Sequence, residues 1–218
     1  MSHSKGLLWI FLLLGGSLAA NGQPANQSNP DADAAISARF DKIYSGPSSL
    51  FTTAPNAFLV KMIEGLKPGR ALDVAMGQGR NAVYLATKGW DVTGYDLSET
   101  GIAAARSAAE KAGVHINAVR SSHQTFDFGH DSWDLIVMTY TLADYEDASF
   151  LRRVRESLKP GGIVVVELMA TPGIGKGPAN ALLHSFLDLR VIHYEDKVDD
   201  SEWGLRKMRI ARLAAQRD

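Results

Sequence analysis

The sequence predicts an α/β fold built on one mostly parallel, doubly wound sheet. Apolar stretches of strand length alternate with stretches of helical spacing between residues 70 and 168. The first of these strands runs into a glycine-containing turn and then into a helix. Two late strands joined by a short connection end the chain, and such a connection requires antiparallel pairing. Together these observations favour a parallel sheet that is completed by a C-terminal antiparallel hairpin.

Two amphipathic helices precede the sheet. Residues 33–44 place Ile36, Phe40 and Ile43 on one helical face. A second helix is expected over residues 55–65, where a glycine ends it.

The body of the sheet follows as repeated strand–helix units. We expect strands at 70–75, 90–96, 115–120, 133–140 and 163–168, and helices at 80–88, 98–112 and 148–158. Ser98 is a suitable N-cap, and Glu99 lies in the first turn of its helix. Residues 159–162 (Lys-Pro-Gly-Gly) are predicted to form the turn before the fifth strand. The alternation predicts parallel pairing with right-handed crossovers.

The C-terminal part departs from this alternation. We expect a loop at 171–178, a short helix at 179–187, a strand at 189–196, a turn at 197–204 and a last strand at 205–214. Basic residues gather at the end of the chain, and alternation along a terminal strand predicts that they form a solvated face rather than a binding patch. They are Arg206, Lys207, Arg209, Arg212 and Arg217.

Composition narrows the range of functions. The 218 residues suffice for one domain, and a net charge of −1 indicates neither a nucleic-acid partner nor an anionic membrane. The absence of cysteine excludes disulfides, a thiolate nucleophile and a Cys-ligated zinc site, and we predict no metal site. No Walker A or HExxH sequence is present to indicate phosphoryl transfer or metal-dependent hydrolysis.

The N-terminus predicts export. Lys5 precedes an apolar run at 7–14 and small residues at 15–20, the pattern of a secretory signal peptide. The run is too short for an ordinary spanning helix, although an uncleaved interfacial anchor is an alternative. We therefore expect a signal peptide at 1–20, a flexible linker at 21–32 and a single domain at 33–218. The protein is expected to be periplasmic or secreted, or cytoplasmic if the signal does not function, with no stable membrane insertion after cleavage.

The turn after the first strand predicts a site for a nucleoside-bearing cofactor. Gly77 and Gly79 allow a ligand to approach bare backbone where a helix begins. Asp96 follows Gly79 by 17 residues and ends the second strand, where its carboxylate can accept hydrogen bonds from two ribose hydroxyls. The spacing of Gly77, Gly79 and Ala82 also fits a dinucleotide fingerprint. However, the chain lacks the length for a second nucleotide half and ends in a hairpin.

Several ordered motifs carry a family resemblance. Residues 72–86 (Leu-Asp-Val-Ala-Met-Gly-Gln-Gly-Arg-Asn-Ala-Val-Tyr-Leu-Ala) resemble the first motif of class I S-adenosylmethionine-dependent methyltransferases, and residues 89–98 resemble the second. Residues 132–137 are similar to the fourth strand of that family, and residues 158–162 to the turn before its fifth. The Gly-Arg-Asn-Ala-Val-Tyr-Leu-Ala run and the Pro-Asn helix start at residues 55–56 are similar to the tellurite-resistance and thiopurine branch.

The resemblance covers about residues 33–218 and implies a three-layer, Rossmann-like sheet with strand order 3-2-1-4-5-7-6. It also implies S-adenosylmethionine as cofactor and a small-molecule methyl acceptor as partner. The cofactor-binding residues that it implies are Asp73, Ala75, Gly77, Gly79, Asn81, Asp96, Leu97, His123, Gln124, Thr125 and Tyr140.

The resemblance also assigns roles within this set. Asp73 and the glycine turn would hold the methionine tail, while Asp96 would bind the ribose and Leu97 would pack on the adenine. Residues 123–125 would border the adenine edge, and Tyr140 would lie under the sulfonium methyl.

Methyl transfer from a sulfonium is an in-line displacement in which the protein mainly supplies alignment and a dry site, so we assign no catalytic residue. His184 and His193 are isolated and are not expected to act as bases, and Asp134 is expected to be structural. Two alternatives remain: an exported or degenerate domain that binds the cofactor without turnover, and a dinucleotide-binding oxidoreductase.

Overall fold

The computed structural model describes residues 29–46, 51–170 and 180–218. Its strands are β1 (Arg70–Val74), β2 (Asp91–Asp96), β3 (Asn117–Arg120), β4 (Trp133–Thr139), β5 (Leu158–Met169), β6 (Arg190–Asp200) and β7 (Lys207–Gln216). Its helices are α1 (Pro30–Tyr44), α2 (Ala57–Met62), α3 (Arg80–Thr87), α4 (Glu99–Lys111), α5 (Ala148–Ser157) and α6 (Ala181–Ser185). The predicted signal peptide and the predicted loop at 171–178 lie outside the described residues.

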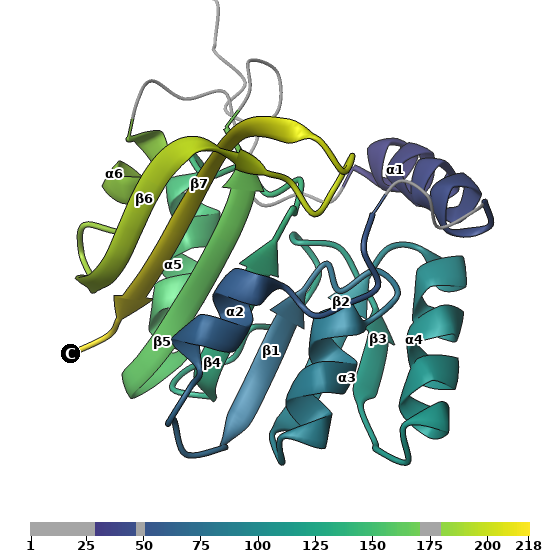
Figure 1. Cartoon of the computed structure of the whole chain (residues 1–218), viewed down its shortest axis with the longest axis horizontal. Helices are drawn as coiled ribbons and strands as arrows, with labels where there is room; N and C mark the ends of the chain where they lie inside the picture. Colours follow the sequence, from purple (N-terminus) through teal and green to yellow (C-terminus); the bar gives the residue numbers. More distant parts are fainter. Residues whose placement is uncertain (1–28, 47–50, 171–179) are drawn as a thin grey trace, which may run out of the picture.

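One seven-stranded sheet with the order β3-β2-β1-β4-β5-β7-β6 organises the molecule (Figure 1). β1 to β5 pair in parallel, whereas β7 pairs antiparallel with both β5 and β6. The predicted α/β class, strand order and C-terminal hairpin are confirmed. The strand order reverses beside β1, which places the carboxyl ends of β1, β2 and β4 around one crevice, where such sheets bind ligands.

Helices cover both faces of the sheet and enclose two hydrophobic cores. α2, α3 and α4 lie on one face, where Leu59, Leu85 and Ala105 pack against apolar strand residues. α5 and α6 lie on the opposite face, where Phe150 and Phe186 are completely or almost completely buried. Because both faces are covered, the central strands are apolar along most of their length.

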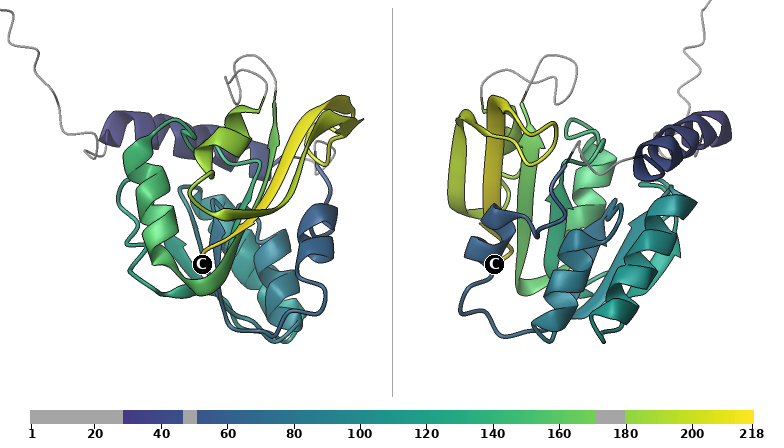
Figure 2. Two further views of the ribbon diagram at one scale, coloured as in Figure 1. Left: turned by 90° about the vertical axis from the view of Figure 1, so that its left-hand side faces the viewer. Right: turned by 45° about the vertical axis from the view of Figure 1, so that its right-hand side comes forward.

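α1 stands apart from the three layers and lies beside the carboxyl ends of the strands, over α4 (Figure 2). Asn29 caps it by accepting a hydrogen bond at Oδ1 from the Ala32 backbone N–H at 3.2 Å. The helix therefore begins at Pro30, whereas the predicted linker continued to residue 32. A capping Asn followed by a proline in the first turn explains the earlier start.

The predicted turn at 159–162 is part of β5. Leu158 already pairs with Trp133, and an irregularity in the register then brings Ile163 opposite Leu135. Gly161 adopts a φ of 80° within this irregular start and donates its N–H to the Arg217 carbonyl at 2.7 Å. Backbone bonds to the last residues of the chain thus hold as strand a segment whose composition is typical of a turn.

The C-terminal hairpin is longer than predicted. β6 continues to Asp200 because its last residues pair with the start of β7, so the connecting loop is confined to residues 201–206. The prediction of a solvated basic face is wrong for Arg212, whose side chain is only 13% exposed. It forms ion pairs with Glu167, Glu195 and Asp199.

Across the part of the chain that the structure describes, no helix combines the length and the apolar character needed to cross a bilayer.

Candidate functional site

A cavity of about 710 Å³ opens at the carboxyl ends of β1, β2 and β4, beneath α1. This volume lies within the range of small-molecule sites. Nine of the eleven residues implied as cofactor-binding line it: Ala75, Gly77, Gly79, Asn81, Asp96, Leu97, His123, Gln124 and Tyr140. The fold therefore brings most of the expected set to one place.

The glycine turn forms the floor of this cavity. Gly77 and Gly79 have φ values of 55° and 75°, in the left-handed region that favours glycine. A Cβ on Gly79 would lie 2.6 Å from the Ala105 side chain of α4, so no larger residue fits. Since Gly79 caps α3, the turn presents bare backbone at the start of that helix.

Asp96 joins the tip of β2 to this turn. Its Oδ2 accepts the Gly77 N–H at 2.9 Å, and its Oδ1 accepts the Ser98 N–H at 2.8 Å. The residue is 8% exposed, and burial raises the pKa of its carboxyl. Each carboxylate oxygen keeps one lone pair beyond its backbone bond, so Asp96 can still accept two hydroxyl groups from a ligand.

Asp73 and Thr125 do not line the cavity. Asp73 is 2% exposed, and its Oδ2 accepts the Ala82 N–H at 3.0 Å, so it braces the first turn of α3 instead of facing a ligand. Burial raises the pKa of Asp73 to about 7. The Thr125 hydroxyl accepts the Ser122 N–H at 3.1 Å and holds the loop after β3 in shape.

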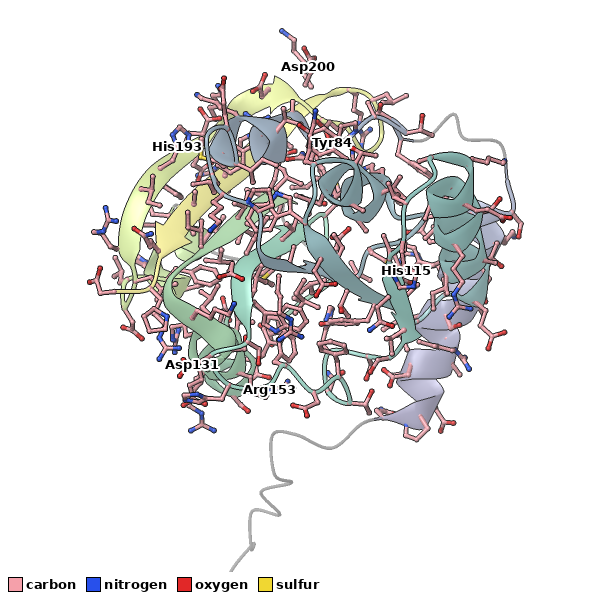
Figure 3. All side chains as sticks on the ribbon, turned by 90° about the horizontal axis from the view of Figure 1, so that it is seen from below. Tyr84, His115, Asp131, Arg153, His193 and Asp200 are labelled. Carbon is pink, nitrogen blue, oxygen red and sulfur yellow. The ribbon has the colours of Figure 1, made fainter. Side chains whose placement is uncertain are left out.

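His123 borders the cavity on the side of β2 and β3. Its Nδ1 lies 2.9 Å from the Tyr95 hydroxyl, and its carbonyl accepts a hydrogen bond from the Arg153 Nη2 at 2.8 Å; Figure 3 labels Arg153. Burial, with a smaller contribution from Arg153, lowers the pKa of His123 to about 4. The ring is therefore neutral at physiological pH and offers polar contacts without charge.

Tyr140 lies at the opposite side of the cavity, just after β4. Its hydroxyl donates to Glu167 Oε1 at 2.6 Å and accepts the Glu202 N–H at 3.1 Å. Burial, followed by the nearby Glu167, raises the pKa of Tyr140. With its hydroxyl engaged as both donor and acceptor, Tyr140 contributes the position of its ring rather than proton transfer.

A buried polar network behind Tyr140 was not predicted from the sequence. Glu167, 1% exposed at the end of β5, accepts from Asn56 Nδ2 at 2.8 Å and forms the ion pair with Arg212. Asn56 also caps α2, with its Oδ1 accepting the Leu59 N–H at 2.9 Å. A single carboxylate within the apolar run 163–168 was the available signal for this network.

α1 covers the cavity and is held there by polar contacts. Asp41 Oδ1 accepts from the Ser98 hydroxyl at 2.5 Å and from the Thr100 N–H at 3.0 Å, both at the N-terminus of α4. The Ser37 hydroxyl donates to the Leu97 carbonyl at 2.9 Å. Tyr44, the last residue of α1, lies over Gly77 and lines the cavity.

The other residues singled out earlier lie elsewhere. Asp134 is structural, as predicted, because its Oδ2 accepts the Arg70 N–H and the Lys159 Nζ, each at 2.7 Å. His193 lies against Phe58 of α2, with the ring centroids 5.2 Å apart, and is not part of the cavity lining (Figure 3). Among the described residues, no group of three or more His, Asp or Glu side chains is arranged to hold a metal.

Comparison with known proteins agrees with this geometry. Residues 71–162, which include all of β1 except Arg70, the glycine turn, Asp96 and Tyr140, match the family model described as a methyltransferase domain. The chain is 26% identical over 182 residues to a probable S-adenosyl-L-methionine-dependent methyltransferase, TehB, of Haemophilus influenzae. That alignment covers 76% of this chain but only 63% of the relative. A putative methyltransferase of a Geobacillus species is 34% identical over 107 residues, 47% of this chain and 43% of the relative.

Solved structures show the same fold. The crystal structure of TehB from Haemophilus influenzae has a TM-score of 0.67 at 23% identity and covers 84% of this chain and 67% of that one. A Burkholderia thailandensis 1,6-didemethyltoxoflavin-N1-methyltransferase, with that compound and S-adenosylhomocysteine bound, has a TM-score of 0.65 at 18% identity. It covers 88% of this chain and 91% of the other.

Proposed function

The chain belongs to the class I S-adenosylmethionine-dependent methyltransferases, and we propose that it transfers a methyl group from S-adenosylmethionine to a small-molecule acceptor. The observation that carries the proposal is the pairing of Asp96 with the Gly77 N–H at the wall of one cavity. This pairing joins a bare-backbone turn to a carboxylate with two free acceptor positions.

The residues present fit this cofactor. The left-handed turn at Gly77 and Gly79 presents bare backbone to the cavity, where we place the methionine tail, and Asp96 can accept both ribose hydroxyls. Leu97 and the neutral His123 lie on the same side of the turn as Asp96, where an adenine would be bordered by apolar and uncharged surface. Tyr140 lies across the turn from Asp96, on the side where we place the acceptor.

When bound, the cofactor supplies a methyl group already activated by its sulfonium charge. The protein's task is then to align the acceptor and to exclude water. α1 excludes water from above, because Asp41 and Ser37 fasten it to α4 and to the end of β2. Tyr140, held at its hydroxyl by Glu167 and Glu202, provides a fixed surface next to the acceptor.

A small acceptor agrees with the size of the cavity. About 710 Å³ must hold both the cofactor and the acceptor, and residues of α1 line one side of this space. The Burkholderia thailandensis enzyme, which shares this fold, binds 1,6-didemethyltoxoflavin together with S-adenosylhomocysteine in its crystal structure.

Calorimetry and product analysis on the purified full chain test the proposal. We expect S-adenosylmethionine to bind and S-adenosylhomocysteine to accumulate when a panel of small thiols, amines and phenols is added. Binding without product above the rate without acceptor would instead support a degenerate binding domain. Binding of NAD with no binding of S-adenosylmethionine would support an oxidoreductase.

We also propose that residues 1–20 direct export, on the basis of the basic, apolar and small-residue pattern described above. A reporter fused after residue 30 should appear outside the cytoplasm, and a matched fusion lacking residues 1–20 should stay inside. A cytoplasmic signal from both fusions would contradict the proposal.

A further inference from the structure

We propose that Arg80 binds the carboxylate of the cofactor's methionine tail and that Glu202 is the positioning residue that aims Arg80 at it. The inference rests on the proposed use of S-adenosylmethionine and adds two residues that the family motifs did not assign. The methionine tail carries a negatively charged carboxylate, which needs hydrogen-bond donors. The glycine turn offers only backbone N–H groups for this purpose, so a charged side-chain donor is expected nearby.

Arg80 is the one Lys or Arg side chain among the described residues that line the cavity. It is the first residue of α3 and directly follows Gly79, so it enters the cavity at the glycine turn. A guanidinium is planar and binds a carboxylate through two parallel N–H groups. The position and the charge of Arg80 therefore both suit a carboxylate that lies over the turn.

The hydrogen bonds of Arg80 leave one edge of the guanidinium available. Nη1 donates to Glu202 Oε2 at 2.6 Å and to the Ala54 carbonyl at 3.0 Å. Nε and Nη2 have no protein partner within the described residues, and these two groups form the edge that binds a carboxylate side-on. The protein thus anchors one end of the guanidinium and leaves a two-donor edge for a ligand.

Glu202 is itself fixed from several directions. Its Oε1 accepts the Ala57 N–H at 2.9 Å, and its Oε2 also accepts Asn56 Nδ2 at 2.9 Å. Its backbone N–H donates to the Tyr140 hydroxyl at 3.1 Å, and its carbonyl accepts the Thr52 N–H at 3.1 Å. Glu202 therefore connects the β6–β7 loop to the start of α2, to α3 and to the residue after β4.

The guanidinium of Arg80 lies close enough to the glycine turn to act on the charged and titratable groups around it. The Arg80 charge acts to lower the pKa of both Asp73 and Tyr44, which lie behind and above the turn, although burial outweighs it at each. The guanidinium carbon is also 5.9 Å from the centre of the Tyr140 ring. Arg80 thus lies between the glycine turn and Tyr140, where the tail would run.

Two ligands separate the tail from the nucleoside. S-adenosylhomocysteine carries the amino-acid tail, whereas 5′-methylthioadenosine lacks it and keeps the adenosine part. We would measure the dissociation constants of both by calorimetry on the full chain, for wild type and for Arg80→Gln, Arg80→Lys and Glu202→Gln. Arg106→Gln on α4 is the matched control, because Arg106 donates to the Ala118 carbonyl and does not line the cavity.

Arg80→Gln should weaken S-adenosylhomocysteine binding about 10- to 100-fold, since charge-assisted hydrogen bonds are lost, and change 5′-methylthioadenosine binding less than about twofold. Arg80→Lys keeps the charge but not the two-donor edge and should weaken the first ligand less, about three- to tenfold. Glu202→Gln should also weaken only the first ligand, about three- to tenfold, whereas a purely structural role would weaken both. The control should change neither.

Equal loss of both ligands, or no loss of S-adenosylhomocysteine, in a folded Arg80→Gln variant would overturn the inference while leaving the proposed function intact. If the folded wild-type chain bound neither ligand, the proposed function would fail first, and the inference with it.

Discussion

The two sides of the cavity are built in different ways. On the Asp96 side, carboxylate oxygens accept backbone N–H groups from residues 2 and 19 positions away in the sequence. On the Tyr140 side, side chains bond to one another across the molecule: Asn56 to Glu167 over 111 positions and Arg80 to Glu202 over 122. One side is a local product of the strand–turn–helix unit, and the other forms only when the start of α2 and the C-terminal hairpin dock on the sheet.

The two sides also handle buried charge differently. Asp96 is stabilised by backbone dipoles and retains a raised pKa, because burial outweighs those bonds. Glu167 is paired directly with Arg212, which also holds Glu195 and Asp199 on β6. Removing one member of a buried pair leaves an uncompensated charge, so we expect the Tyr140 side to be the more sensitive to mutation in terms of stability.

The largest effect is expected at Glu167. Glu167→Ala should lower the free energy of unfolding by about 3–5 kcal/mol, because Arg212, Asn56 and Tyr140 all lose a buried partner. Urea denaturation followed by circular dichroism measures the change.

Glu195→Gln is the control for that experiment. Glu195 bonds to the same Arg212 but lies in a more exposed position on β6, so its loss should cost less than about 1 kcal/mol. Similar losses of unfolding free energy in Glu167→Ala and Glu195→Gln would contradict the expectation that the buried carboxylate matters more than the more exposed one.

Substitution of Asp96 should lower the affinity for the cofactor. Asp96→Ala should weaken S-adenosylmethionine about 100-fold or more, since two charge-assisted hydrogen bonds to the ribose are lost. Calorimetry measures this directly, and Asp91→Ala, at the exposed start of the same strand, should leave the affinity unchanged. An unchanged affinity in Asp96→Ala would show that the ribose lies elsewhere.

The smallest expected effect is a pH dependence of the free energy of unfolding, caused by titratable groups on the Asp96 side. The raised pKa of Asp73, from 3.8 to about 7, contributes stability that is fully present below pH 3.8 and is lost as the pH rises toward 7. The lowered pKa of His123, from 6.5 to about 4, contributes stability that is present above pH 6.5 and is lost as the pH falls toward 4. Between about pH 4 and 6.5 the Asp73 contribution to stability therefore falls with rising pH, while the His123 contribution rises.

Removing one titratable group at a time should reveal the pH dependence of stability that each group causes. In Asp73→Asn, the stability should rise with pH between 4.5 and 6.5, by about 1 kcal/mol per pH unit more than in wild type. In His123→Gln the difference should have the opposite sign. Denaturant titrations at several pH values would show this, and parallel curves for all three proteins would refute the assignment of the two pKa values.

Much of the fold could be predicted because it depends on local patterns. Ser98 caps α4 as expected, with its hydroxyl accepting the Gly101 N–H at 2.9 Å, and the glycines set the turn through their own backbone freedom. Two boundaries in the C-terminal half differ because distant segments set them. Residues 159–162 became strand because they bond to Arg217, and β6 lengthened because β7 pairs with it.

The same division holds for the site. The sequence by itself determined the α/β class, the glycine turn and Asp96 at the tip of β2, because these follow from periodicity and from spacings shorter than one strand–helix unit. Only the tertiary structure decided that Asp73 turns away from the cavity, that Arg212 is buried and that Glu202 reaches Arg80. The last two outcomes depend on which side chains meet when the hairpin closes on the sheet, and no short-range pattern in the chain specifies that meeting. Asp73 instead bonds to the Ala82 N–H within its own strand–turn–helix unit, where burial and not the spacing decides its direction.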